Sequence, residues 1–182
     1  VLEENGIRFT TAADFNGTAS FSYRITDGRG GSSEATASFT VKPVNDAPVA
    51  ASIAVETDED VVLKGKVVAS DIDGDTLTFA IKADAGAAKG EVKIDAATGE
   101  WVYAPNANVN GTDSFTVVVS DGRGGSADSV VSVTINPVND APVAVDDRIT
   151  VSEKDNASFD LVANDTDVEG DRLTLISVAV AG

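Results

Sequence analysis

The stretch NVNGTDSFTVVVSDGRGGSADSVVSVTINPVNDAPVA at residues 108–144 repeats, without a gap, the stretch DFNGTASFSYRITDGRGGSSEATASFTVKPVNDAPVA at residues 14–50. Twenty-one of the 37 positions are identical, and 94 residues separate every aligned pair. Self-similarity at one fixed, long period indicates a tandem array of like units. A period of this length is too long for a helical solenoid repeat, and it suits one small all-β domain per repeat.

Short runs of alternating apolar and polar residues predict β-strands along the whole chain. A glycine-rich DGRGGS hairpin turn separates the two strands of each copy, at 27–32 and 121–126. No stretch predicts a long amphipathic helix, and residues 83–89 allow one helical turn at most. Trp101 and Tyr103 alternate with polar or small neighbours, so we expect them in a core, as we do Ile7 and Phe9 of the first copy. The strands expected from this pattern lie at 21–25, 35–41, 53–55, 61–67, 77–81, 92–94, 101–103, 115–119 and 131–135.

The composition excludes several classes of function. The chain has 30 acidic and 13 basic side chains, a formal net charge of −17, and no cysteine, histidine or methionine. Such a charge repels nucleic acid and anionic lipid, and no apolar run is long enough for a membrane span, so we expect neither a nucleic-acid partner nor membrane insertion. Disulfides, imidazole catalysis and the usual zinc sites are excluded. A divalent cation is the expected counter-ion for carboxylates that cluster in turns.

The motif PVNDAPVA, at 43–50 and again at 137–144, marks the expected domain boundaries, because its two prolines stiffen the chain and end the preceding strand. We call these segments the first and second linkers. They predict the C-terminal half of one repeat at 1–47, a complete repeat with seven strands at 48–141, and the N-terminal half of a further repeat at 142–182. We call residues 48–141 the middle unit. Since the chain begins within a repeat, we expect it to be a piece of a longer protein.

The two half-repeats pose a physical problem, because about three strands each should not bury a stable core alone. Together they have the length of one whole unit, yet we expect them at opposite ends of the middle unit. One hypothesis is therefore head-to-tail self-association, in which the first half-repeat of one chain completes the last half-repeat of another. The alternative is that the ends pack in some other way.

Several motifs together resemble the cadherin-like repeats of large bacterial surface proteins, including RTX-type adhesins and VCBS-type repeat proteins. They are DIDGDTLTF (71–79), IDAATGEW (94–101), NGTDSFTVVVSDGRGG (110–125) and PVNDAPVA. The resemblance implies tandem Greek-key β-sandwiches, cadherin-like or immunoglobulin-like, with calcium at the joints between them. Pro43 and Pro137 replace the acidic residue that opens the animal cadherin linker, and YAPNANVNG at 103–111 replaces a late acidic tetrapeptide. We therefore expect fewer ligands per joint than in animal cadherins.

Calcium takes six to eight oxygen ligands, mainly carboxylates and carbonyls on flexible loops. The turn at 71–75, DIDGD, places three carboxylates together, and the resemblance brings it beside the preceding linker. The alternative is that aspartate and glycine are ordinary turn formers and bind nothing. We expect Asp27 only to cap its DGRGG turn, and for Asp121 both a cap and a ligand stay open. In the half-repeat at 142–182, Asp165 and Asp167 align with Asp71 and Asp73 at the same 94-residue offset, and after a two-residue insertion Asp171 aligns with Asp75. The expected ligands are Asn45, Asp46, Asp71, Asp73, Asp75 and Asp121 at the first joint, and Glu59, Asn139, Asp140, Asp165, Asp167 and Asp171 at the second.

We expect a spacer or adhesion repeat of a large, secreted adhesin at the bacterial surface, stiffened by calcium and connected to neighbouring repeats of the same chain. The alternative function is a polysaccharide-binding module, in which Trp101 and Tyr103 stack on a sugar. Paired carboxylates also occur in glycosidases. Here they lie in duplicated turns, so no enzymatic activity is expected.

Overall fold

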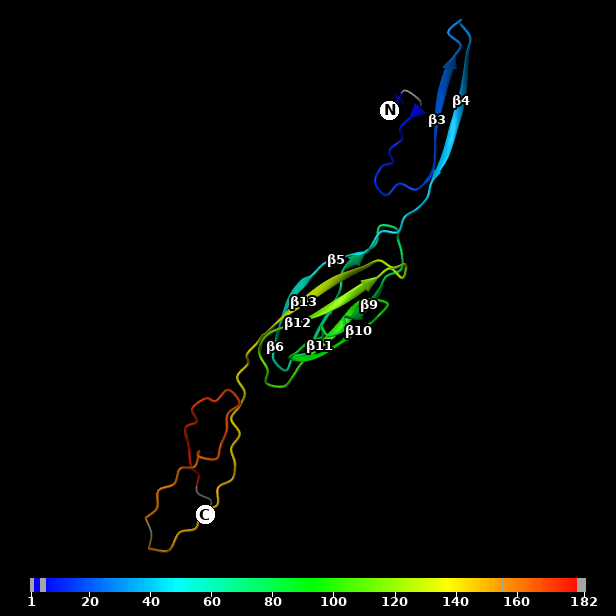
Figure 1. Cartoon of the computed structure of the whole chain (residues 1–182). Coiled ribbons are helices and arrows are strands. Elements are labelled where there is room, and N and C mark those ends of the chain that lie inside the picture. Colours follow the sequence, from blue (N-terminus) through cyan, green and yellow to red (C-terminus); the bar gives the residue numbers. More distant parts are fainter. Residues whose placement is uncertain (1, 4–5, 155, 180–182) are drawn as a thin grey trace.

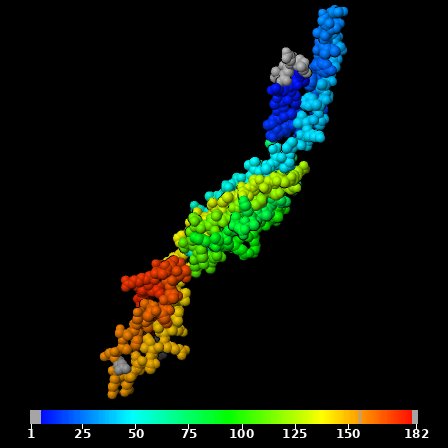
Figure 2. Space-filling model, viewed as in Figure 1, coloured from blue at the N-terminus to red at the C-terminus, as the bar shows by residue number. Residues whose placement is uncertain are grey.

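The computed structural model describes residues 2–3, 6–154 and 156–179, and it contains strands, turns and loops with no helix among them. Its parts follow one another along an elongated molecule, with the two terminal segments at opposite ends of the middle unit (Figure 1; Figure 2). The strands are β1 (Leu2–Glu3), β2 (Gly6–Ile7), β3 (Gly17–Thr26), β4 (Ser32–Val41), β5 (Val49–Ala50), β6 (Ile53–Asp58), β7 (Leu63–Lys66), β8 (Ala69–Ser70), β9 (Thr78–Ile81), β10 (Gly90–Ile94), β11 (Glu100–Pro105), β12 (Gly111–Ser120) and β13 (Ser126–Asn136).

The middle unit is a β-sandwich, which confirms the expected fold class. One sheet has the strand order β6-β13-β12-β9 and the other β10-β11-β7. All neighbours are antiparallel except β6 and β13, the first long strand and the last, which run parallel. Nine strands lie in this unit where the alternation predicts seven. The two additional strands are β5, at the end of the first linker, and its partner β8, and both are too short to show a periodic pattern.

Apolar side chains from the two sheets meet in one core. Trp101 and Tyr103 of β11 are 1% and 0% exposed, which confirms their expected place in the core. Both rings contact Phe115 of β12, at centroid distances of 5.4 and 6.2 Å. Because neither ring reaches the surface, neither can stack on a sugar. The ten buried hydrophobic residues among those described all lie between Val67 and Ile135, so the core belongs to the middle unit alone.

One buried carboxylate ties a long loop to this core. Asp113 accepts hydrogen bonds from the backbone amides of Ala88 and Lys89, at 2.9 and 2.8 Å, and from the hydroxyl of Tyr103, at 2.8 Å. Burial alone raises the pKa of Asp113, but these hydrogen bonds, with one from Ser114, together hold it below its usual value. The same contacts fix residues 83–89 as a series of turns, and the single helical turn allowed by the sequence is not formed.

The described residues of the terminal segments form strands or a bridge but no buried core. In the first, β3 and β4 form a ten-residue hairpin, and Ile7 and Phe9, expected in a core, remain 45% and 49% exposed. In 142–179 the expected strands are absent from the described residues, where the pairing is a single bridge between Val143 and Thr166. A strand needs a paired neighbour and a covered face, and neither segment contains the other half of its sandwich.

Candidate metal centre

The turn that follows β8, which we call the first acidic turn (71–75), collects three carboxylates. Oδ1 of Asp71 accepts hydrogen bonds from the backbone amides of Asp73 and Asp75, at 2.9 and 3.3 Å. Gly74 completes the turn with a φ of 76°, a backbone conformation that glycine adopts without strain. One oxygen from each of Asp71, Asp73 and Asp75 lies within 4.8 Å of the others. The local sequence therefore folds back on its own first carboxylate and directs all three acids to one place.

Two oxygens of this turn lack the partners that buried carboxylates normally have. Oδ2 of Asp71 and Oδ2 of Asp75 are buried, and no described residue donates a hydrogen bond to either. The other oxygen of Asp75 contacts Nε of Arg123 at 2.9 Å. Buried polar atoms without partners are costly. Their chemistry, hard anionic oxygens on a tight loop, fits a divalent cation such as Ca²⁺.

The first linker is attached to this turn and to the neighbouring hairpin turn. The backbone amide of Asp46 donates to Oδ2 of Asp73 at 2.7 Å, and Nδ2 of Asn45 donates to Oδ2 of Asp121 at 2.7 Å. The structure thus brings together, across the linker, the residues that the sequence assigns to the first joint. Asn16, from the loop before β3, lines one cavity with Asn45, Asp73, Asp75 and Arg123. Residues on both sides of the linker therefore face the same space.

Asp121 caps the turn between β12 and β13. Its Oδ1 accepts hydrogen bonds from the amides of Arg123 and Gly125, at 2.7 and 2.9 Å. The side chain of Asn45, followed by the amide of Arg123, lowers the pKa of Asp121. Asp27 makes the equivalent cap in the first copy, where its Oδ1 accepts from the amides of Arg29 and Gly31. Asp121 differs from Asp27 in that it also binds the linker.

At the second joint the structure corrects the sequence alignment by two residues. Oδ1 of Asp167 accepts from the amides of Glu169 and Asp171, at 3.1 and 3.0 Å, as Asp71 does in the first acidic turn. Gly170 has a φ of 77°, matching Gly74. The bridge between Val143 and Thr166 likewise reproduces the pairing of Val49 with Ser70. Residues 167–171 are therefore the second acidic turn, and the two-residue insertion precedes the turn instead of interrupting it.

Glu169 consequently takes the place of Asp73. The amide of Asp140 donates to Oε2 of Glu169 at 3.3 Å, repeating the contact between Asp46 and Asp73. Asp165 falls in the insertion, where its Oδ1 accepts from the amide of Val145 at 2.8 Å. Glu169 is absent from the ligands expected from sequence because that alignment placed the two-residue insertion after Asp167, inside the turn. The order acid-x-acid-glycine-acid, shared by DIDGD and DVEGD, is the signal that identifies it.

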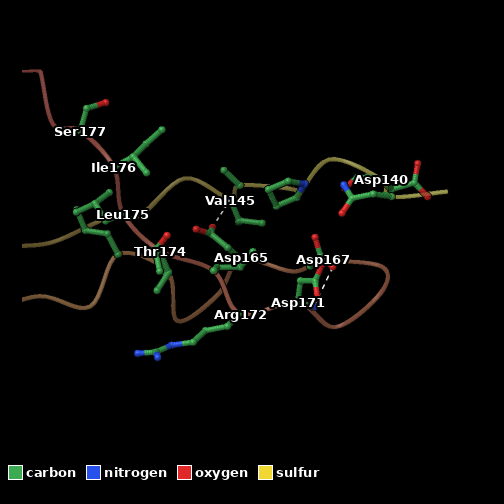
Figure 3. A pocket seen from close by; sticks show the side chains of 16 residues that line it. Asp140, Val145, Asp165, Asp167, Asp171, Arg172, Thr174, Leu175, Ile176 and Ser177 are labelled. Atoms are coloured by element: carbon green, nitrogen blue, oxygen red, sulfur yellow. Dashed lines mark hydrogen bonds between the residues drawn. The ribbon is translucent and has the colours of Figure 1, made fainter. Parts of the chain in front are cut away.

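The remaining second-joint residues lie around the same linker. Asn139, Asp140, Asp165, Asp167 and Asp171 line one cavity. Figure 3 shows Asp140 at the same end of it as Asp167 and Asp171, with Leu175 and Ile176 at the other end.

Oδ2 of Asp140 is buried without a hydrogen-bond partner among the described residues. Glu59 is 3% exposed and its Oε1 accepts from the amide of Val138 at 2.7 Å, so it holds the start of the second linker.

Comparisons with known proteins match this architecture. A family model described as bacterial Ig domain matches residues 45–134 and 139–182, and one described as cadherin-like domain matches residues 1–42. Domains of these kinds suggest an extracellular adhesion-type module, are typically non-enzymatic, and in the cadherin-like case generally bind calcium. The described residues include no helix with the length and apolar character needed to cross a membrane.

Individual proteins resemble this chain over only part of their own length. The integrin beta-like protein A of Dictyostelium discoideum is 32% identical over 111 residues, which make up 54% of this chain and 6% of that protein. A solved structure of protocadherin gammaB7 EC3-6, a cis-dimer, has a TM-score of 0.52 and 22% identity over 74% of this chain and 36% of its own, which shows the shared fold. An endo-fucoidan hydrolase of glycoside hydrolase family 107 has 21% identity over 70% of this chain and 20% of its own, and its TM-score of 0.41 is too low to support any inference about activity.

Proposed function

Because the chain belongs to the bacterial Ig domain family, we propose that it is a spacer and adhesion segment of a large secreted or surface-bound bacterial adhesin, of the RTX or VCBS kind, whose joints are stiffened by Ca²⁺. The observation that carries this proposal is the contact between linker and turn at the first joint. The amide of Asp46 binds Asp73, while buried oxygens of Asp71 and Asp75 beside it have no donor among the described residues. A cation held there would connect the linker to the middle unit.

The proposed ligands follow from this arrangement. Asp71, Asp73 and Asp75 would hold the ion at the first joint, with Asn45, Asp46 and Asp121 positioned by the linker contacts. At the second joint, Asp167, Glu169 and Asp171 would form the equivalent set, joined by Glu59, Asn139, Asp140 and Asp165. When bound, calcium would neutralise a local excess of carboxylates in a chain with a net charge of −17. The domain boundaries at 1–47, 48–141 and 142–182 belong to the same proposal, since the joints define them.

Calorimetric titration with Ca²⁺ tests the proposal directly. We expect a dissociation constant on the order of 10⁻⁴ M, as in extracellular calcium modules, and a rise in Tm of the middle unit at millimolar Ca²⁺. The paired substitutions Asp71→Asn and Asp73→Asn should remove the rise that belongs to the first joint. Glu91→Gln, an exposed carboxylate on β10 of the same unit, is the control and should leave it unchanged. No heat and no Tm shift in the unsubstituted protein would refute the metal site.

A second activity, head-to-tail self-association, is favoured by a specific observation. Tyr23 and Ile25 of β3 are 46% and 60% exposed, whereas the residues 94 positions later, Val117 and Val119, are 0% exposed. At the other end of the chain Leu175 is 57% exposed. Each terminal segment therefore presents apolar positions that the middle unit buries against the opposite half of a sandwich. We propose that a polypeptide of this sequence pairs the β3–β4 hairpin of one copy with residues 142–179 of another.

Light scattering after size-exclusion chromatography measures this association. The protein should form dimers and longer species as its concentration rises, and Phe39→Asp on β4 should reduce them. Trp101, the single tryptophan, reports whether the middle unit remains folded in that variant. A strict monomer at high concentration would refute the association. A protein that stays monomeric and binds a glycan through these exposed apolar faces would refute it as well.

A further inference from the structure

Arg123 is placed where a cation would be needed. It lies in the DGRGG turn between β12 and β13, and its Nε contacts Oδ1 of Asp75 at 2.9 Å. The side chain of Asp75 is 10% exposed, so the carboxylate that Arg123 pairs is nearly buried. That carboxylate belongs to the group of three in the first acidic turn, and its second oxygen has no partner among the described residues. The guanidinium therefore forms an ion pair with one oxygen of one carboxylate, in a group of three carboxylates.

The backbone holds this arginine in position. The amide of Arg123 donates to Oδ1 of Asp121 at 2.7 Å, and Asp121 in turn accepts from the side chain of Asn45 in the first linker. A single turn thus presents both the carboxylate that binds the linker and the guanidinium that binds the acidic turn. The backbone of Arg123 is therefore held by the same contacts that build the joint.

We propose that Arg123 is a built-in counter-ion of the first acidic turn, and that it sets the calcium affinity of the first joint by competing with the ion. This inference rests on the calcium site proposed above. Without calcium, the guanidinium offsets part of the repulsion among Asp71, Asp73 and Asp75 and keeps the turn formed. When calcium is bound, the positive charge of the guanidinium repels the ion. Its contact with Asp75 also occupies one oxygen that could otherwise coordinate the ion.

The size of the effect follows from exposure. The side chain of Arg123 is 66% exposed, so water screens its charge strongly. A unit charge a few ångströms from a bound cation, at this degree of screening, should weaken binding by about three- to tenfold. Replacing Arg123 with glutamine should therefore strengthen calcium binding by that factor. In the absence of calcium it should lower the Tm of the middle unit, because Asp75 loses its ion-pair partner and the repulsion among the three carboxylates is no longer offset.

The internal repeat supplies a matched control. Arg29 occupies the same position in the DGRGG turn of the first copy, 94 residues earlier, and its amide donates to Asp27 as that of Arg123 does to Asp121. Its turn joins β3 to β4 at the end of the hairpin that points away from the middle unit (Figure 1). Arg29→Gln makes the same change in net charge without removing a charge from the acidic turn. It should alter neither the calcium affinity of the first joint nor the Tm of the middle unit.

The experiment compares Arg123→Gln, Arg123→Lys and Arg29→Gln with the unsubstituted protein, by calcium titration calorimetry and by melting followed through Trp101 fluorescence in EDTA. We expect tighter calcium binding and a lower Tm in EDTA for Arg123→Gln, and no change for Arg29→Gln. Arg123→Lys keeps the positive charge, so its calcium affinity and Tm should be close to those of the unsubstituted protein. If that protein binds calcium and Arg123→Gln behaves like Arg29→Gln, the inference about Arg123 fails and the calcium site stands. If the unsubstituted protein binds no calcium, the site and the competition both fail.

Discussion

Gly125 ends the DGRGG turn in close contact with the first linker, so replacing it with alanine tests how firmly the linker is attached. A Cβ built at this position would lie 2.9 Å from the Cα of Ala47 and would overlap Oδ2 of Asp121. The Asp121 oxygen is the one that binds Asn45. Either the linker backbone or the carboxylate must move, and both movements break the contact between the hairpin turn and the linker.

Overpacking of this kind costs about 1 to 3 kcal/mol, and each kcal/mol lowers the Tm of a domain of this size by roughly 4 to 8 °C. Trp101 fluorescence follows the melting of the middle unit, since that residue is buried in its core. Gly31→Ala is the control. The three nearest atoms to its Cβ all belong to Asp27, the closest at 2.6 Å, so the same local crowding occurs within the β3–β4 hairpin turn.

We expect Gly125→Ala to lower the Tm of the middle unit and to speed hydrogen exchange at the amide of Asp46, which the linker contact protects. Gly31→Ala should do neither. Equal exchange at Asp46 in both variants would show that the hairpin turn does not hold the linker, and the attachment of the linker at the first joint would be refuted.

Three further predictions concern the middle unit. Asp113→Ala should cost about 2 to 4 kcal/mol, because it leaves the buried hydroxyl of Tyr103 without an acceptor, and adding Tyr103→Phe should recover part of that loss in a double-mutant cycle. Folding lowers the pKa of Asp113, so its contribution to the free energy of unfolding is complete above about pH 4, where the unfolded side chain ionises. This contribution is lost as pH falls through the lower folded pKa. Urea titrations between pH 2 and 6 should show the decline in the unsubstituted protein and much less of it in Asp113→Ala. Gly65→Ala should destabilise the unit by about 1 to 3 kcal/mol, because its Cβ would lie 2.6 Å from Cε2 of Trp101, whereas Gly86→Ala, with nothing within 4 Å, should not.

Much of the fold follows from the sequence because the repeat and the alternation are both strong. The hairpin strands β12 and β13 carry apolar residues at alternate positions, Phe115, Val117 and Val119 in one and Val131, Val133 and Ile135 in the other, and they are central to their sheet. Trp101 and Tyr103 follow the same rule and lie in the core. β5 and β8 are two residues long, so periodicity cannot reveal them, and they form because the first linker runs beside the acidic turn.

The terminal segments show the limit of reasoning from local pattern. Residues 142–179 correspond to 48–83 of the middle unit, but strand formation depends on a partner hairpin that this segment does not have. The same limit applies to the site. Carboxylates in DIDGD identify the first acidic turn, but Arg123 is 48 residues after Asp75 and meets it only because β9 and β12 pair in one sheet. Glu169 was not predicted for a different reason: the sequence places the two-residue insertion equally well inside the turn or before it, and only the hydrogen bonds of Asp167 decide between them.

Pulsed electron paramagnetic resonance across the first joint tests the central claim most directly. Ser38→Cys on β4 and Ser132→Cys on β13 are exposed, repeat-equivalent positions in a chain without native cysteine, so spin labels attach only there. If a divalent cation fixes the linker to the acidic turn, millimolar Ca²⁺ should narrow the distribution of distances between the labels relative to EDTA, and Asp71→Asn with Asp73→Asn should abolish the narrowing. Distributions of equal width in Ca²⁺ and EDTA would contradict a calcium-stiffened joint.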